Sequence, residues 1–218
     1  MSVYTVLLDE LGQTQLVAVS KTKPVEEIMK LYNQGQRVFG ENKVQELVEK
    51  YDLMPKDIQW HLIGHLQTNK VKYIASFVAM IHAVDSLKLL QEINKEAAKH
   101  GRVIQVLLQM HIAKEDTKFG LDNSELEEIL AYYLSPQSEL KHVAICGVMG
   151  MATFTHDDEV VSLEFRHLKE VFQYIRNGYL LNRPEFKEIS MGMSNDYKIA
   201  LHEGTTMVRI GSLLFGER

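Results

Sequence analysis

The chain has 218 residues, of which 45% are hydrophobic and 24% are charged, and this composition is typical of a globular protein with a sizeable core. The net charge of −5 gives no indication of a nucleic acid or an anionic membrane as a partner. The first residues lack the pattern of a signal peptide, and no apolar segment is long enough to span a bilayer. Cys146 is the only cysteine, so no intrachain disulfide can form, and we expect a cytoplasmic protein.

Short apolar runs alternate with longer segments of helical periodicity, and no linker divides them, so we expect one domain over residues 1–218. The predicted strands are residues 16–21, 37–42, 59–64, 80–85, 103–112, 143–152, 188–194 and 207–216. The clearest predicted helices are residues 24–35, which begin at Pro24 and end at Gly35, residues 86–101, residues 124–134, which begin with a capping box of Ser124 and Glu127, and residues 158–178.

Eight strands that alternate with helices predict a single α/β domain folded as a (β/α)8 TIM-type barrel. The alternative is an open doubly wound sheet, but no Gly-x-Gly-x-x-Gly turn follows the first strand. In a barrel the carboxyl ends of all strands lie on one face, which carries the active site. The polar residues expected there would suit an anionic ligand, and they are Ser20, Lys21, Glu41, Asn42, His61, His111, Ser194, Arg209 and Gly211.

Lys21 ends the apolar run "LVAVSK" and has the parity of Val17 and Val19, so its side chain should point the same way as theirs. One interpretation is a surface lysine that ends the strand. The other is an amine against apolar walls, where a lowered pKa lets the neutral form attack a carbonyl and make a Schiff base. We expect Lys23, at the entrance of the next helix, to act as an electrostatic neighbour.

Arg209 interrupts the otherwise apolar run "MVRIGSLLFG", and a buried guanidinium requires a partner. An ion pair with a neighbouring strand, a ring nitrogen or a phosphate would each provide one. Ser194 opens a segment with the pattern of a helix start, where backbone N–H groups favour an anion. Gly211 and Ser212 add a second group of donors, and the last two strands of a barrel are the usual place for a phosphate.

The pattern of histidine, cysteine and methionine residues does not indicate a further reactive or metal-binding site. His61 and His65 are four residues apart, but on a strand and a turn rather than on a helix, so we expect no metal site. Cys146 is expected to be a small core residue. Methionines 149, 151, 191 and 193 are expected to pack in the core or against a cofactor.

Together, several motifs resemble, in order and spacing, the pyridoxal phosphate homeostasis proteins (the YggS/PROSC family). They are "LVAVSKTKP", "FGENKVQE", "WHLIGHLQTNK", "GVMGMAT", "SMGMSNDYKIAL" and "GTTMVRIGSLLFG", within a match from Leu16 to Arg218. The resemblance implies a (β/α)8 barrel like the N-terminal domain of alanine racemase, with pyridoxal 5′-phosphate (PLP) held as an imine. By motif position it assigns the PLP imine to Lys21, the pyridine-nitrogen contact to Arg209, the phosphate contacts to Ser190, Ser194, Gly211 and Ser212, and places Asn42 beside the ring and Met193 against it.

Two features depart from that family. Its members usually carry an N-terminal helix before the first strand, whereas only fifteen residues precede Leu16 here, which leaves open how the bottom of the barrel is closed. The fifth strand of the family usually ends with asparagine, and this chain has His111 instead.

The resemblance also bears on whether the protein is an enzyme. An arginine at the pyridine nitrogen keeps that nitrogen unprotonated, which disfavours a long-lived carbanion but is compatible with racemisation or with no catalysis. Alanine racemases also need a second domain, which supplies a tyrosine from the partner subunit, and this chain ends two residues after "LLFG".

We therefore expect a non-catalytic, monomeric PLP-binding protein that acts in vitamin B6 homeostasis, with PLP-dependent apo-enzymes as candidate recipients of the cofactor and with no catalytic or metal-binding residue. One alternative is a single-domain PLP-dependent amino-acid racemase with Lys21 as one base. A second is a Schiff-base aldolase that acts on a phosphosugar and uses Lys21 without a cofactor.

Overall fold

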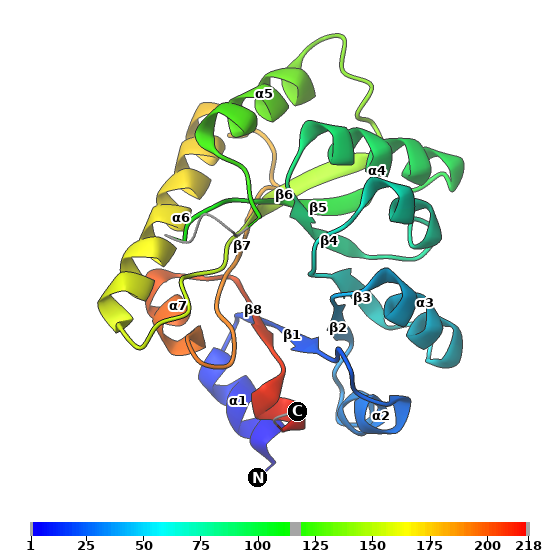
Figure 1. Cartoon of the computed structure of the whole chain (residues 1–218), viewed down its shortest axis with the longest axis vertical. Coiled ribbons are helices and arrows are strands. Elements are labelled where there is room, and N and C mark those ends of the chain that lie inside the picture. Colours follow the sequence, from blue (N-terminus) through cyan, green and yellow to red (C-terminus); the bar gives the residue numbers. More distant parts are fainter. Residues whose placement is uncertain (1, 114–118, 217–218) are drawn as a thin grey trace.

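The computed structural model of the chain describes residues 2–113 and 119–216, and its eight strands close into one parallel barrel in the order β1 to β8 (Figure 1). The predicted (β/α)8 fold class is thus confirmed. The barrel closes where β1 pairs with β8, with Val17 opposite Arg209. The strands are β1 (Gln15–Val19), β2 (Val38–Glu41), β3 (Gln59–Leu62), β4 (Met80–Val84), β5 (Ile104–Gln109), β6 (Val143–Met149), β7 (Glu188–Ser190) and β8 (Met207–Ile210).

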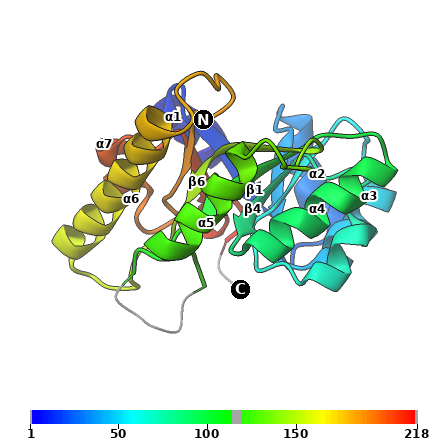
Figure 2. The ribbon, with the colours of Figure 1, turned by 90° about the horizontal axis from the view of Figure 1, so that it is seen from above.

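Helices cover the outside of the barrel, with α1, α6 and α7 on one side in Figure 2 and α2, α3 and α4 on the other. The ranges confirm the four predicted helices to within a few residues. The helical elements are α1 (Val3–Leu11), α2 (Val25–Asn33), α3 (Val44–Leu53), the 3₁₀ helix η1 (Thr68–Tyr73), α4 (Leu87–Lys99), α5 (Asn123–Leu134), α6 (Asp158–Gly178), α7 (Tyr197–Glu203) and α8 (Ser212–Phe215).

Several local predictions are wrong. The predicted strands 103–112, 143–152 and 188–194 end three or four residues too late, because β5, β6 and β7 end at Gln109, Met149 and Ser190. The last strand ends at Ile210, because the apolar segment Ser212–Phe215 forms the short helix α8. Periodicity cannot distinguish strand from helix in so short an apolar run. The capping box of α5 uses Asp122 and Glu125 instead of Ser124 and Glu127, so Ser124 lies inside the first turn.

The segment before the first strand does form a helix, contrary to the expected departure from the family. The helix α1 buries Tyr4, Leu7 and Leu11 and packs against β1 and α8. The Tyr4 hydroxyl donates to Gln36, two residues before β2, and Glu10 accepts from a tyrosine of α7. Since it thereby contacts elements on both sides of the β1–β8 seam, α1 covers the part of the barrel wall that the four-residue α8 is too short to cover (Figure 1).

The strands carry two cores with opposite parity. Residues such as Ala18, Phe39 and Trp60 point outward and pack against the helices. Residues of the other parity fill the barrel interior, where the apolar members are Val17, Val38, Met80, Ala83, Leu107, Cys146, Met149 and Met207. The interior also holds four buried polar side chains, His61, His82, Ser190 and Arg209, which hydrogen-bond to one another.

Among the described residues, no helix has both the length and the apolar character that a membrane crossing requires.

Burial of two neutral histidines should make the protein less stable in acid. Burial lowers the pKa of His61 to about 3, and the pKa of His82 falls well below 6.5 through burial and, secondarily, the nearby His61 and Arg209. Below the ordinary histidine pKa of about 6.5 the unfolded chain therefore binds more protons than the folded one. Each histidine should then reduce the free energy of unfolding by up to about 1.4 kcal/mol per pH unit as the pH falls.

Urea unfolding of wild type and His61→Gln between pH 7 and pH 4.5 tests this expectation. The comparison with a variant is needed because burial raises the pKa of Glu41, and this acts in the opposite direction. The wild-type free energy of unfolding should fall more steeply than that of His61→Gln below pH 6.5. Parallel curves would show that His61 is not a buried neutral group.

Candidate functional site

The carboxyl face of the barrel carries the loops that hold most of the predicted site residues. Lys21 lies two residues after β1 and Asn42 lies directly after β2, and both side chains are half-buried. Met193 and Ser194 lie in the turn between β7 and α7, while Gly211 and Ser212 join β8 to α8. The fold therefore places these six residues at the ends of four strands, which are hydrogen-bonded neighbours in the order β7, β8, β1 and β2.

The turn that carries Lys21 is strained. Thr22 has a φ of 65°, and among the described residues it is the only one other than glycine with a positive φ. For a β-branched residue this conformation costs on the order of 1–3 kcal/mol. It is held by a hydrogen bond of 2.5 Å from the Thr22 backbone N–H to Glu46 Oε1. Strain of this kind concentrates at functional sites, and here it lies next to Lys21.

A largely buried cluster of charged side chains supports that turn from outside the barrel wall. Lys50 Nζ donates to Glu41 Oε1, to Glu46 Oε1 and to the carbonyl of Ser20, each at 2.7 Å. The Ser20 hydroxyl donates to Glu41 at 2.6 Å. Burial raises the pKa of Glu41, and the hydrogen bond from Lys50 opposes that shift. Both neighbours of Lys21 are thus tied to one cluster of three charged side chains.

Lys23 has a separate structural role. Its Nζ donates to the carbonyl of Phe215 at 3.0 Å and to that of Gly216 at 3.4 Å. Lys23 therefore joins the β1 loop to the end of α8, so that the loops after the first and last strands are held together.

Arg209 is buried in the barrel interior and bound by the two preceding strands. Its NH1 donates to the carbonyl and to the Oγ of Ser190, at 2.8 and 2.7 Å, and its NH2 donates to the carbonyl of Gly150 at 3.0 Å. These bonds use three of the five N–H donors of the guanidinium, and no described residue accepts from the other two. Burial lowers the pKa of Arg209 to about 10, so it stays charged at neutral pH.

Ser190, which the family resemblance assigns to the phosphate, lies at the end of β7 with its side chain inside the barrel. Its hydroxyl is fully buried and bonded to Arg209 and, at 3.0 Å, to His82 Nδ1. His82 Nε2 is in turn 2.9 Å from His61 Nδ1. The hydroxyl is therefore committed to a chain of buried polar groups.

The loops after β7 and β8 meet through Ser194, whose Oγ accepts from the Gly211 N–H at 3.3 Å. Gly211 packs closely on β1, where an added Cβ would lie 3.1 Å from the carbonyl oxygen of Val19. Gly192 has a φ of 93°, and a Cβ there would be 2.6 Å from that of Ala200. Met193 is one-third exposed at this edge. The backbones of these two loops are thus closely packed, and the Ser194 hydroxyl links them.

Asn42 is positioned by a glycine contact on the neighbouring strand end. A Cβ at Gly64 would lie 2.5 Å from the Asn42 carbonyl oxygen, so only glycine fits there. The backbone of Asn42 therefore rests directly on the loop after β3.

Sequence reasoning missed Lys50 and His82, which hydrogen-bond to Ser20 and Ser190 without standing at a strand end. The spacing of Glu46 and Lys50 by one helical turn was the available signal for the first, and it is also typical of an exposed pair. Burial raises the pKa of the Cys146 thiol to about 11, which is consistent with a packing role. Within residues 2–113 and 119–216, no group of three or more His, Cys, Asp or Glu side chains could hold a metal ion.

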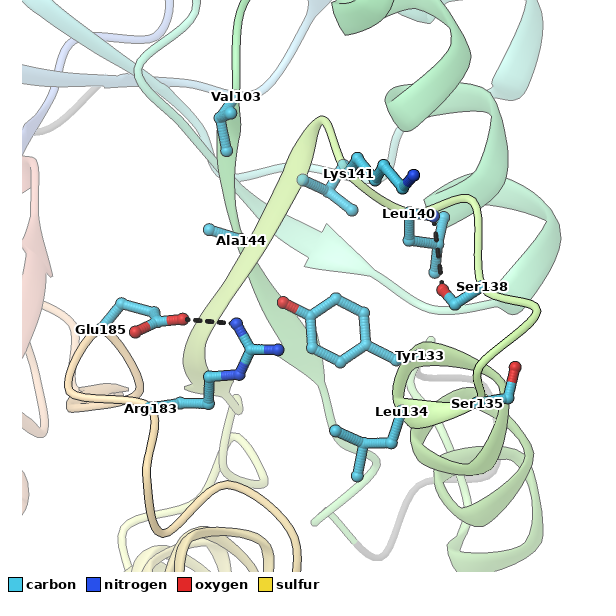
Figure 3. Close-up of a pocket in the computed structure, with 11 residues that line it drawn as sticks. Val103, Tyr133, Leu134, Ser135, Ser138, Leu140, Lys141, Ala144, Arg183 and Glu185 are labelled. Atoms are coloured by element: carbon cyan, nitrogen blue, oxygen red, sulfur yellow. Dashed lines mark hydrogen bonds and ion pairs between the residues drawn. The ribbon is translucent and has the colours of Figure 1, made fainter.

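Two hollows lie at the opposite end of the barrel and contain none of the residues that the family resemblance assigns to PLP. His61 was predicted at the carboxyl face, but it lines one of these hollows at the amino end, so that prediction is wrong. The pocket in Figure 3 lies at the start of β5 and β6, where Tyr133 of α5 faces the ion pair of Arg183 and Glu185. A second cavity, of about 640 Å³, is lined by His61 and by residues at the starts of several strands. The cavities at the amino end of the barrel are therefore distinct from the candidate site at the carboxyl face.

Comparison with known proteins agrees with this geometry. The family model for the alanine racemase N-terminal domain matches residues 4–218. A pyridoxal phosphate homeostasis protein from Aquifex aeolicus is 42% identical over 94% of this chain and 87% of its own length. PipY of Synechococcus elongatus, in a structure with PLP bound, is 33% identical, with a TM-score of 0.87 and 98% of each chain covered.

An alanine racemase from Bartonella henselae with covalently bound pyridoxal phosphate shares the fold, with a TM-score of 0.72. It is 14% identical, and this chain covers 62% of it. That likeness concerns the barrel, whereas the likeness to the Aquifex protein extends over nearly the whole of both sequences. The chain therefore belongs to the alanine racemase N-terminal domain family and, within it, to the pyridoxal phosphate homeostasis proteins.

Proposed function

We propose that this protein binds PLP at the carboxyl face of the barrel, with Lys21 bonded to the aldehyde carbon as a Schiff base and Arg209 facing the pyridine nitrogen. The observation that carries the proposal is the buried Arg209 guanidinium. It has two uncommitted N–H donors, and its strand pairs with the strand that leads to Lys21. A relative with PLP bound shares the fold over almost its whole length.

The residues present fit the chemical groups of PLP. Its aldehyde requires an amine, and Lys21 provides one on a strained, firmly held turn. Its ring nitrogen requires a partner, and Arg209 is a donor that stays charged. Its phosphate requires several donors, and Ser194 supplies a hydroxyl proton because its oxygen already accepts from Gly211. The Ser212 hydroxyl and the backbone N–H groups of this loop complete the proposed phosphate site.

Three further residues belong to the proposal. Asn42 lies beside the ring and Met193 packs against it, as their places after β2 and β7 allow. Ser190 acts as the acceptor that orients Arg209, because its hydroxyl is already bonded inside the barrel. Bound PLP supplies an electron sink for carbanion chemistry, and an arginine at the ring nitrogen keeps that sink weak.

We infer that the protein carries PLP in the cytoplasm without turning over a substrate, with no catalytic residue, as a single-domain monomer that hands the cofactor to PLP-dependent apo-enzymes. The names of its 42%-identical relative and of others support a homeostatic role. The alternative, an amino-acid racemase that uses Lys21 as one base, is favoured only by the shared barrel fold.

The absorbance of purified protein tests the role of Lys21. Wild type saturated with PLP should be yellow, and borohydride should fix the cofactor to Lys21, as peptide mass mapping would show. Lys21→Ala should lose the band, while the matched control Lys23→Ala should keep it. A colourless wild type that binds no added PLP would overturn the proposal, and borohydride trapping of a phosphosugar by that colourless protein would favour the aldolase.

Loss of Arg209 should weaken cofactor binding and shift the absorbance band. A hydrogen bond to a charged group contributes about 1.5–3 kcal/mol, so Arg209→Ala should raise the PLP dissociation constant roughly tenfold to hundredfold. Arg102→Ala is the matched control, because Arg102 also donates to two backbone carbonyls but borders β5 at its amino end. If Arg209→Ala leaves both affinity and spectrum unchanged, the ring contact is assigned to the wrong residue.

Racemase activity is tested directly by chiral chromatography. L-alanine and other L-amino acids incubated with PLP-saturated wild type should stay optically pure, within the background set by Lys21→Ala with free PLP. Any excess of D-isomer over that background that depends on Lys21 would establish the enzyme alternative.

A further inference from the structure

A continuous chain of hydrogen bonds crosses the barrel interior from the proposed cofactor site to the opposite mouth. It runs from Arg209 NH1 to Ser190 Oγ (2.7 Å), to His82 Nδ1 (3.0 Å), and from His82 Nε2 to His61 Nδ1 (2.9 Å). All four side chains are at most 4% exposed. His61, the last member, lines the cavity at the amino end of the barrel.

The chemistry of the members determines the direction of the chain. A guanidinium can only donate, so the Ser190 oxygen accepts from Arg209. Among the described residues, the acceptor within reach of the single Ser190 hydroxyl proton is then His82 Nδ1. A buried hydroxyl without an acceptor is costly, so His82 Nδ1 must be unprotonated.

The same reasoning fixes both imidazoles. With Nδ1 unprotonated, neutral His82 carries its proton on Nε2 and donates it to His61 Nδ1. His61 therefore also carries its proton on Nε2, at the cavity. Burial disfavours the cationic form of both rings, and the charge of Arg209 disfavours it further at His82. Every hydrogen bond in the chain points away from Arg209.

We propose that His82 is a positioning residue for the cofactor: by accepting the Ser190 hydroxyl proton, it fixes that hydroxyl as an acceptor for Arg209 and so sets the direction of the guanidinium. The inference rests on the proposed function, in which Arg209 contacts the pyridine nitrogen. Without an acceptor at the His82 position, the Ser190 hydroxyl turns, and one of the two bonds that hold Arg209 NH1 is weakened.

The polarity of the chain has a chemical consequence. Since each member donates toward the amino end, none of them presents an acidic proton to the cofactor ring. Arg209 keeps its own protons because its pKa is about 10. The interior therefore holds the pyridine nitrogen in its unprotonated form and excludes the protonated ring.

The first test uses the protein without added PLP. Long-range ¹H–¹⁵N NMR of histidine-labelled protein should show His82, assigned with His82→Asn, as neutral with the proton on Nε2, unchanged between pH 6 and pH 8. A protonated Nδ1 would reverse the Ser190–His82 bond and overturn the inference. This result does not depend on cofactor binding.

The second test compares three variants by PLP titration and absorbance. His82→Leu removes the acceptor, and we expect about a tenfold weaker PLP affinity, as for one hydrogen bond to a charged group, with a shifted band. His82→Asn, whose side-chain oxygen can replace Nδ1 as the acceptor, should recover most of both. Leu107→Met changes the packing of the same interior and should match wild type.

The outcomes distinguish a failure of the proposed function, PLP binding, from a failure of the proposed role of His82. If wild type binds no PLP, the proposed function fails, while the NMR result still decides the direction of the chain. If wild type binds PLP and His82→Leu behaves like Leu107→Met, His82 does not position Arg209, and the proposed function stands. Equal losses in His82→Asn and His82→Leu would likewise contradict a positioning role.

Discussion

The burial of the Arg209 charge is the constraint on which the carboxyl half of the barrel depends. A guanidinium moved from water into an apolar interior must find acceptors within reach, because leaving it unpaired costs several kcal/mol. Two backbone carbonyls, of Gly150 and Ser190, meet that need, so the ends of β6, β7 and β8 are fixed relative to one another. Gly150 is tightly enclosed, since an added Cβ would lie 2.6 Å from Ile112. The position of one charged side chain therefore determines the backbone of three neighbouring strands.

The turn that carries Lys21 is held from outside the barrel wall. Its neighbours Ser20 and Thr22 are bonded to Glu41, Glu46 and Lys50 between the strands and α3, while Arg209 is held from within the barrel. A network of three charges, two of which are buried, contributes little net stability, because desolvation offsets most of the attraction. Its evident effect is to maintain a strained turn at Thr22. The lysine and the arginine are thus held by separate networks, so either side can be altered without dismantling the other.

Much of the fold followed from pattern, because a (β/α)8 barrel repeats one unit eight times. The eight apolar runs were sufficient to predict the topology, but not where the last strand stops, since "SLLF" suits a helix as well as a strand. Lys21 and Arg209 could be singled out because each breaks an apolar run. His82 could not, because the Ser190 contact joins residues 108 positions apart. Ser190 itself was predicted to face a phosphate, and only the parity of β7 in the closed barrel directs its hydroxyl to Arg209 and His82.

The barrel shared with alanine racemases does not decide between carriage and turnover, because one fold supports many activities. The interior of this barrel bears more directly on that choice. A protonated pyridine ring stabilises a carbanion best. In the proposed complex a charged arginine faces the ring, and the inferred direction of the chain through Ser190, His82 and His61 leads away from it. An amino acid that reaches the aldehyde would then meet a weak electron sink. Under the proposed function, an interior that holds the ring neutral would let Lys21 bind and release the aldehyde while side reactions at the bound amino acid stay slow, and this is the property that a carrier of a reactive cofactor requires.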